Sequence, residues 1–173
     1  MSELAQRMLA ATSKQAREAA LLVLEDGAAF QGIACGASGE VFGEICFNTA
    51  LEGYLEVVTD PSYAGQVVVM TYPQIGNYGV NPDDQVLDRP VLAGVVMRDL
   101  CYTPSSFRLT GDLPSYLRKN GIVGIEGVDT RALAMHLRDA GPLAAIISTV
   151  DLDPASLARR AQALNATTEG REI

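Results

Sequence analysis

Short apolar runs separated by turn residues constrain the fold of this 173-residue chain more than any other feature. The run at 66–72 is β-branched and apolar at consecutive positions, a pattern typical of strands that are buried on both faces. Asp26-Gly27 lies between two such runs and favours a tight hairpin. The runs predicted to form strands cover residues 20–25, 28–35, 41–48, 66–72, 91–97, 122–125 and 143–148.

Helix signals concentrate in the second half of the chain. Residues 112–119 predict a short helix, and Asp129 can cap a helix over 130–139 by accepting free N–H groups of its first turn. Asp153-Pro154 opens a final helix, with an acceptor at the cap and proline in the first turn. Strands therefore come first and then alternate with helices, an order that predicts an α/β or α+β domain with a mixed sheet.

Charge and hydropathy argue against two classes of partner. The chain has 13 Lys and Arg against 21 Asp and Glu, a formal net charge of −8. Binding to nucleic acid or to anionic lipid requires a basic face. No apolar run approaches the roughly 20 residues of a membrane-spanning helix, and the first residues lack the apolar centre of a secretory signal. We therefore expect a cytoplasmic protein with neither nucleic-acid nor membrane partners.

Few residues could do chemistry by themselves. Cys35, Cys46 and Cys101 are scattered without a CxxC pair, so they predict neither a disulfide framework nor a zinc site. The one histidine, His136, could pair with Cys35 in a hydrolase if the thiolate and imidazole lay within hydrogen-bond reach. A helix side chain and a small loop residue are simpler interpretations. Asp83-Asp84 is interpreted as a solvated loop, and with no phosphate-binding glycine motif we expect no metal or cofactor in this chain.

The segment 47–81 is rich in Asn, Thr, Ser, Tyr, Gly and Pro. Its part at 49–59 is ambiguous between a short helix and irregular structure, and Asp60-Pro61 presets a turn. Side chains of these types order loop backbone, and ordered loops on a rigid scaffold often carry binding sites. The segment is therefore a candidate for a binding site, and the alternative interpretation is a well-tied structural loop.

Four stretches of the chain resemble a known family. LVLEDG (22–27), GEICFNTALEGYLEVVTDPSYAGQ (43–66), TYPQIGNYGVN (71–81) and GVDTRAL (127–133) are similar, in order and spacing, to the N-terminal domain of the carbamoyl phosphate synthetase small subunit. The resemblance implies an α/β domain of layered β/β/α architecture with mixed sheets. Its implied organisation is an N-terminal extension at 1–19, the domain itself at 20–152, and a C-terminal helix with the start of a linker at 153–173.

The resemblance also implies a part in glutamine-dependent carbamoyl phosphate synthesis. In that family a class I glutaminase domain follows this one and releases ammonia from glutamine with Cys, His and Glu residues. The large subunit combines the ammonia with bicarbonate, using ATP and Mg, for arginine and pyrimidine biosynthesis. This chain has no GxCxG nucleophile motif and no histidine after His136. We therefore expect part of a longer protein, inactive alone, that docks the large subunit in a heterodimer and completes the glutamine pocket.

One site residue carries over from the family's DPSY motif. The serine of that motif contacts the substrate glutamine and corresponds here to Ser62, whose hydroxyl can donate to or accept from the polar groups of glutamine. Without the resemblance, Ser62 is an ordinary turn hydroxyl. Ala50-Leu51-Glu52 and Leu55 depart from the Ser-Met-Thr and Gln usual in the family. An alternative hypothesis is a stand-alone scaffold or regulatory protein that kept this domain without enzymatic activity.

Overall fold

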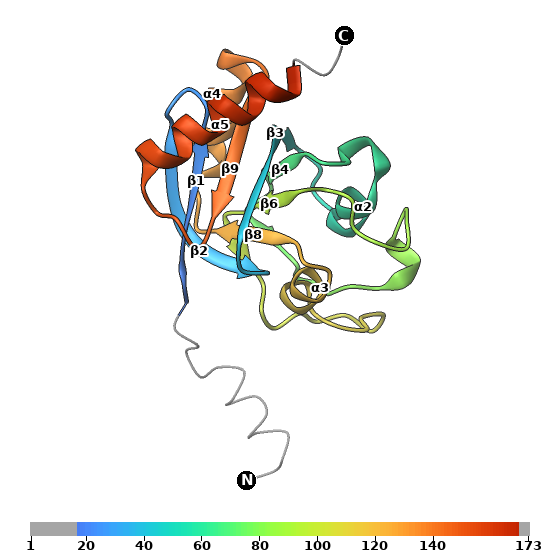
Figure 1. Ribbon diagram of the computed structural model, residues 1–173. Helices are drawn as coiled ribbons and strands as arrows, with labels where there is room; N and C mark the ends of the chain where they lie inside the picture. The colour runs from blue at the N-terminus through green and yellow to red at the C-terminus, as the bar shows by residue number, and fades with distance from the viewer. Residues whose placement is uncertain (1–16, 170–173) are drawn as a thin grey trace.

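Seven strands of the computed structural model form one closed barrel, in the order β1-β2-β8-β6-β4-β3-β9 (Figure 1). The structure describes residues 17–169. The barrel strands are β1 (Ala19–Leu24), β2 (Ala29–Gly36), β3 (Glu40–Asn48), β4 (Val67–Met70), β6 (Gly94–Val96), β8 (Val123–Glu126) and β9 (Leu143–Ser148). A separate two-stranded sheet pairs β5 (Gln74–Ile75) with β7 (Asp99–Leu100).

The barrel has an antiparallel part and a parallel part. β1 pairs antiparallel with β2 and β9, and β2–β8 and β3–β9 are also antiparallel. The pairs β3–β4, β4–β6 and β6–β8 are parallel. Because parallel neighbours need long crossover connections, the longest connections of the barrel lie between the strands of these parallel pairs. They contain α2 (Tyr54–Thr59), α3 (Leu113–Lys119) and the 3₁₀ turns η1 (Pro61–Tyr63) and η2 (Pro82–Asp84).

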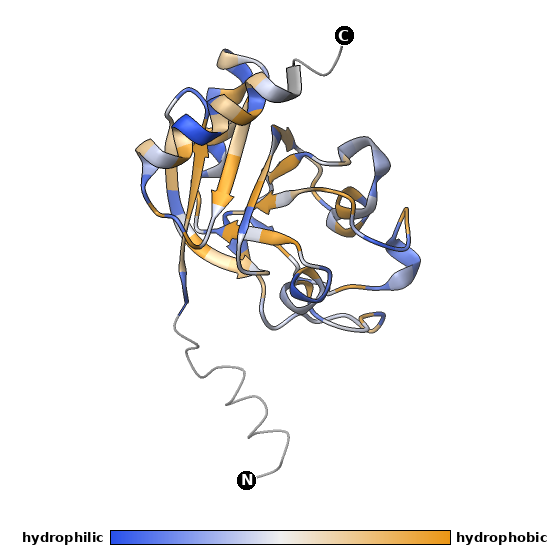
Figure 2. Ribbon diagram, in the orientation of Figure 1, coloured by the Kyte–Doolittle hydropathy of each residue, from blue (hydrophilic) through white to orange (hydrophobic). Residues whose placement is uncertain are grey.

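Successive strand residues alternate between the barrel interior and the helices outside. In β1, Leu22 and Leu24 belong to the interior cluster, whereas Leu21 and Val23 pack against α5 (Pro154–Glu169). The strands are accordingly the most hydrophobic part of the ribbon in Figure 2. In β4 the interior residues are Val67 and Val69, and the outward residues, in the cluster with α2 and α3, are Val68 and Met70.

Helix α4 (Thr130–Ala140) contributes to the interior cluster through Leu133 and Leu137. The Asp129 carboxylate begins this helix by accepting from the Ala132 N–H at 3.1 Å, and the helix ends at Gly141. The predicted capping by Asp129 is therefore confirmed, and it stabilises the helix by satisfying a free donor of the first turn.

All seven predicted strands are present, as is the hairpin at Asp26-Gly27 between β1 and β2. The ambiguous segment 49–59 is irregular up to Gly53 and helical from Tyr54. The α/β class with mixed strand pairing is confirmed, and the layered β/β/α description stays a prediction. Residues 1–16 of the predicted extension and residues 170–173 lie outside the described residues. Between residues 17 and 169, no helix is both long and apolar enough to cross a membrane.

Candidate functional site

Ser62 lies in the 3₁₀ turn η1, in the crossover from β3 to β4, and is exposed. Asp60 caps this turn, with its Oδ1 accepting from the Ser62 backbone N–H at 2.9 Å. That bond, followed by the Ser62 hydroxyl, holds the pKa of Asp60 below its ordinary value. Pro61 occupies the first position of the turn, where its fixed φ is already suitable. The DPSY motif thus builds a preorganised turn that leaves the serine side chain at the surface.

Tyr63 ties this turn to the end of β3. Its hydroxyl oxygen accepts from Asn48 Nδ2 at 2.9 Å, and Asn48 Oδ1 in turn accepts from the Ala50 N–H at 2.8 Å. The Asn48 carbonyl accepts from both the backbone N–H and the hydroxyl of Thr71, at 3.1 and 3.0 Å. One asparagine therefore connects η1, the β3–α2 loop and the end of β4.

Two tyrosines hold helix α2 in place. The rings of Tyr54 and Tyr78 stack with centroids 4.3 Å apart. The Tyr78 hydroxyl accepts from the Gly53 N–H at 2.8 Å, and the Tyr54 hydroxyl donates to the Gly79 carbonyl. Burial raises the pKa of both phenols, so both remain neutral and available for these bonds at physiological pH. Gly53, at φ +84°, occupies a left-handed conformation that glycine adopts without steric cost.

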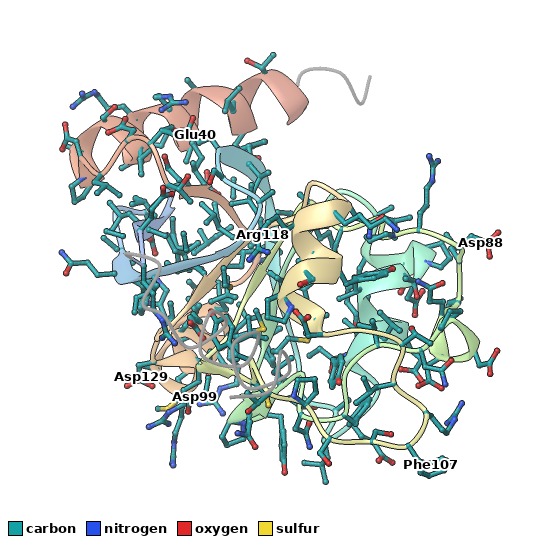
Figure 3. All side chains as sticks on the ribbon, turned by 90° about the horizontal axis from the view of Figure 1, so that it is seen from below. Glu40, Asp88, Asp99, Phe107, Arg118 and Asp129 are labelled. Carbon is teal, nitrogen blue, oxygen red and sulfur yellow. The ribbon has the colours of Figure 1, made fainter. Side chains whose placement is uncertain are left out.

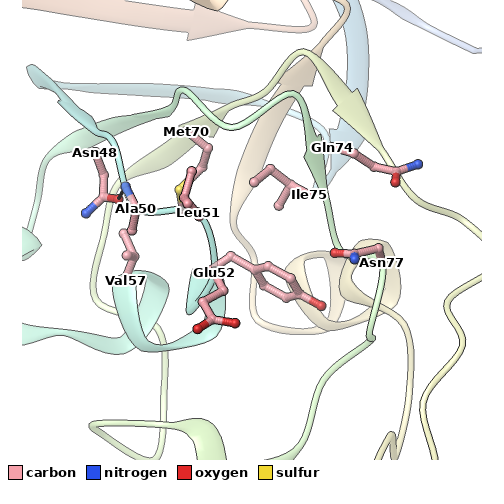
Figure 4. A pocket seen from close by; sticks show the side chains of 10 residues that line it. Asn48, Ala50, Leu51, Glu52, Val57, Met70, Gln74, Ile75 and Asn77 are labelled. Carbon is pink, nitrogen blue, oxygen red and sulfur yellow. Dashed lines mark hydrogen bonds between the residues drawn. The ribbon is translucent and has the colours of Figure 1, made fainter.

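The loop between β3 and α2 borders a small hollow (Figure 4). Its cavity volume of about 10 Å³ is enough for about one water molecule. Leu51 stands at this hollow and is 75% exposed. A second, more open hollow of about 480 Å³ begins at Ala64, directly after η1. The lining of the first hollow includes Asn48, Glu52, Gln74 and Asn77, and that of the second Arg89, Pro90, Val91 and Asn120.

The structure contradicts a hydrolase built on Cys35 and His136. His136 Nε2 lies 2.6 Å from Asp26 Oδ2, at the turn that begins β2. Cys35 is near the other end of β2, roughly 20 Å away at 3.3 Å per residue. The Cys35 thiol is buried, and burial, followed by the Glu126 charge, raises its pKa. A thiol of this kind is a small core residue, and the expectation of a loop residue is wrong because Cys35 lies within strand β2.

Cys46 and Asp84, two further residues that could do chemistry, both bond to neighbouring side chains in the fold. Cys46 donates to Gln66 Oε1 at 3.3 Å, and burial raises its pKa to about 11. Asp84 forms an ion pair with Arg108 at 3.1 Å, which makes it a loop-ordering residue. Across residues 17–169, no three His, Cys, Asp or Glu side chains gather in a group that could hold a metal ion.

The sequence analysis missed Glu126, a carboxylate buried at the end of β8. Its oxygens accept from the Leu100 N–H at 3.0 Å and from the Tyr102 hydroxyl at 2.6 Å. Arg17 approaches within 3.5 Å, and its guanidinium lies 4.9 Å from the centre of the Tyr102 ring. The available signal was a glutamate at the end of an apolar strand. Such a carboxylate is expected to be buried with the strand, and a buried carboxylate needs hydrogen-bonding partners. These partners tie β8 to β7.

Comparison with known proteins confirms the family resemblance of this chain. Residues 22–147 match the family described as "Carbamoyl-phosphate synthase small chain, CPSase domain". The chain is 54% identical over 143 residues to the carbamoyl phosphate synthase small chain of Syntrophotalea carbinolica, covering 83% of this chain and 38% of that protein. It is 57% identical over 141 residues to the small chain of Thermotoga maritima, covering 82% and 36%.

The match in solved structures is weaker. An aminopeptidase from an Aneurinibacillus strain aligns with a TM-score of 0.43 at 19% identity, over 75% of this chain and 30% of the other. That similarity is too low to assign a fold or an activity. The sequence relatives are decisive, although this chain spans well under half of their length. The chain belongs to the family of carbamoyl-phosphate synthase small chains.

Proposed function

We propose that this chain is the N-terminal domain of the small, glutamine-handling subunit of a glutamine-dependent carbamoyl phosphate synthetase. The family match over residues 22–147 supports this assignment. The domain would extend over 20–152 with a layered β/β/α arrangement, after an extension at 1–19. Residues 153–173 would lead into a glutaminase domain.

In this proposal the chain does not catalyse but docks and completes a site. The glutaminase domain releases ammonia from glutamine, and the large subunit uses it with bicarbonate, ATP and Mg to make carbamoyl phosphate. The heterodimer works in the cytoplasm and supplies arginine and pyrimidine biosynthesis. The exposed, preorganised DPSY turn is the observation that carries the role of this domain at the glutamine pocket.

Ser62 would contact glutamine through its hydroxyl. Its backbone N–H already bonds to Asp60, which fixes the turn. The Asp60 carboxylate also attracts the hydroxyl proton. The hydroxyl lone pairs then remain available for a donor such as the ammonium or amide group of glutamine. A fixed hydroxyl gives more affinity than a mobile one, because less ordering entropy is lost on binding.

The test is Ser62→Ala in the full-length small subunit assembled with its large subunit. We expect the KM for glutamine to rise roughly 10-fold, since a lost hydrogen bond costs about 1.4 kcal/mol. Synthesis from free ammonia should not change. Ser38→Ala, at the exposed β2–β3 turn, is the matched control. An unchanged KM for glutamine in Ser62→Ala would remove Ser62 from the site.

Assembly with the large subunit distinguishes the enzyme subunit from the scaffold alternative. Size-exclusion chromatography with light scattering on the full-length protein and the large subunit should show a stable complex that makes carbamoyl phosphate from glutamine. A complex without glutamine-dependent synthesis would favour the scaffold. The absence of a complex at tens of micromolar would contradict both hypotheses.

A further inference from the structure

Helix α5 packs on the outside of the barrel over β1 and β9, with β3 beyond β9 (Figure 1). The apolar contact of α5 is thin. Among residues 154–167, Leu157 and Ala161 are buried, and they meet Leu21, Val23 and Ile146. Partly buried Ala158 and Phe42 pack against the same cluster. Helix orientation normally comes from interlocking side-chain ridges, and alanine offers little to interlock. Polar contacts on the two sides of this narrow stripe therefore have a large share in orienting α5.

On one side, Arg160 binds Glu40 at the start of β3. Its Nη1 lies 3.3 Å from Glu40 Oε2, and its Nη2 donates to Glu40 Oε1. Glu40 Oε2 also accepts from the buried Ser148 hydroxyl at 2.7 Å. Arg160 Nη1 further approaches Asp151 Oδ2 at 3.4 Å, just before α5 begins. Glu40 lies beside α5 in Figure 3. A guanidinium that engages both oxygens of one carboxylate fixes direction as well as distance.

On the other side, two α5 side chains bind Glu25, which directly follows β1. The Glu25 carbonyl accepts from Gln162 Nε2 at 2.6 Å, and Glu25 Oε2 accepts from Asn165 Nδ2 at 3.0 Å. Glu25 Oε1 accepts from the Ala144 N–H at 2.8 Å, so the carboxylate is itself fixed to β9. We call Glu25, Glu40, Arg160, Gln162 and Asn165 together the α5 clamp.

The two halves of the clamp are diagonal to each other. Arg160 and Gln162 are the neighbours of buried Ala161, so at about 100° per residue they project from opposite flanks of the buried stripe. Glu25 joins Ala144 near the start of β9, whereas Glu40 joins Ser148 at its end, roughly 13 Å away along the strand. Attachment on opposite flanks and at opposite ends fixes both the roll of α5 and its angle on the barrel.

We propose that Glu25 and Glu40 are positioning residues for the glutamine-dependent reaction. By holding α5 at a set roll and angle, they orient the following glutaminase domain so that its glutamine pocket meets Ser62. The inference rests on the proposed function, which places that domain after α5. Neither glutamate touches substrate in this scheme, and each acts through the helix. The clamp is needed because a small rotation of α5 becomes a displacement of several ångströms at the far side of a domain.

The test opens both halves of the clamp in the full-length small subunit, assembled with its large subunit. The double variant Arg160→Ala with Asn165→Ala removes the helix side chain that binds the carboxylate of each glutamate, and keeps good helix formers in α5. Arg159→Ala is the matched control, because Arg159 is the adjacent exposed arginine and has no ion pair among the described residues. We expect the double variant to raise the KM for glutamine roughly 10-fold, since small misplacements of reacting groups are costly. Synthesis from ammonia should stay within error.

Two further readouts separate positioning from simple destabilisation. Amide exchange of α5 should be faster in the double variant, while the barrel strands remain protected. As single substitutions, Arg160→Lys should have a smaller effect than Arg160→Ala, because lysine restores a cation beside Glu40. A merely structural role would instead lower the glutamine- and ammonia-dependent rates together.

An unchanged KM for glutamine in a folded double variant would overturn the positioning role. If the unaltered enzyme showed no glutamine-dependent synthesis at all, the proposed function would fail first, and the clamp's role would fail with it. The two failures are distinguishable because failure of the proposed function appears in the unaltered enzyme, whereas failure of the positioning role appears only in the double variant.

Discussion

Helix α5 and the segment around Ser62 are both attached to the barrel by polar side chains, but the chemistry of the attachment differs. At α5, charged and amide side chains of the helix form hydrogen bonds to Glu25 and Glu40. The polar groups on both sides are therefore already paired with each other. Around Ser62, phenols and one asparagine bond mainly to backbone groups, as Tyr54 does with the Gly79 carbonyl and Asn48 with the Ala50 N–H.

The difference bears on what each surface can still do. Backbone-directed bonds make the Ser62 region rigid while groups at its surface stay accessible, including the lone pairs of the Ser62 hydroxyl and the 75% exposed Leu51. At α5, by contrast, the polar side chains that flank the buried stripe, such as Arg160 and Asn165, are already bonded to Glu40 and Glu25. A preordered backbone with unoccupied side chains suits a surface that meets another domain, because little further ordering is required on contact.

The largest expected effect is at Tyr54, which we interpret as the central support of the Ser62 region. Tyr54→Ala removes a buried ring that stacks on Tyr78, so we expect the free energy of unfolding to fall by about 3–5 kcal/mol. Urea denaturation followed by circular dichroism measures this. Tyr54→Phe keeps the ring and loses only the bond to Gly79, and should cost about 1 kcal/mol. Equal effects of the two variants would contradict the importance of the stack.

A smaller effect is expected at Thr59, whose fully buried hydroxyl links α2 to the loop before β6. It donates to the Leu55 carbonyl at 2.8 Å and accepts from the Val86 N–H at 2.9 Å. Thr59→Val keeps the shape and leaves the Val86 donor unpaired, so we expect a loss of about 1–3 kcal/mol. Thermal denaturation checks the loss, and faster amide exchange at Val86 locates it. An unchanged Val86 exchange rate would show that the loop does not depend on this hydroxyl.

The two regions also differ in what the sequence could predict. The β-branched runs and the Asp26-Gly27 turn predicted the strands correctly, because alternation and turn chemistry are local properties. Asp129 and Asp153-Pro154 likewise indicated helix starts from neighbouring residues alone. The DPSY motif located the exposed turn, since Asp60 and Pro61 act within three residues of each other.

Contacts between distant residues were beyond this kind of analysis. Glu126 meets Tyr102 across 24 residues, and Glu40 meets Arg160 across 120. Nothing in the local pattern around Glu40 distinguishes it from a solvated strand residue. The closed ring was also not predicted, because the same strands and turns can pair in several orders and strand order depends on crossovers. The separation of Cys35 from His136 followed only from the length and pairing of β2.

Each side contains a carboxylate with a lowered pKa, Asp60 in the Ser62 turn and Glu40 at α5, but only Glu40 is paired with a cation. The Arg160 hydrogen bond holds the pKa of Glu40 below its ordinary value. A depressed carboxyl pKa contributes stability above the unfolded-state pKa of about 4.3, and this is lost as pH falls through the folded-state pKa. Glu40→Gln should therefore be less stable than the unaltered chain at neutral pH, with the difference shrinking below about pH 4.3 and vanishing as the pH falls through the lower folded-state pKa. Chemical denaturation across this range measures it, and a constant difference would exclude the ion pair as its cause.

The smallest effect on stability is expected at Leu51, and it is the sharpest check on the comparison. Because its side chain is 75% exposed beside the Asn48 hollow, Leu51→Ala should change the free energy of unfolding of this chain by less than about 0.5 kcal/mol. If the Ser62 region is a prepared contact surface, the same substitution in the full-length small subunit should lower its thermal stability by clearly more, since the leucine is then buried by the second domain. Leu152→Ala, at the 49% exposed leucine just before α5, is the control and should have the same small effect in both proteins. Equal, small effects of Leu51→Ala in both proteins would mean that the second domain does not cover this face, and that the unused side chains around Ser62 are ordinary surface.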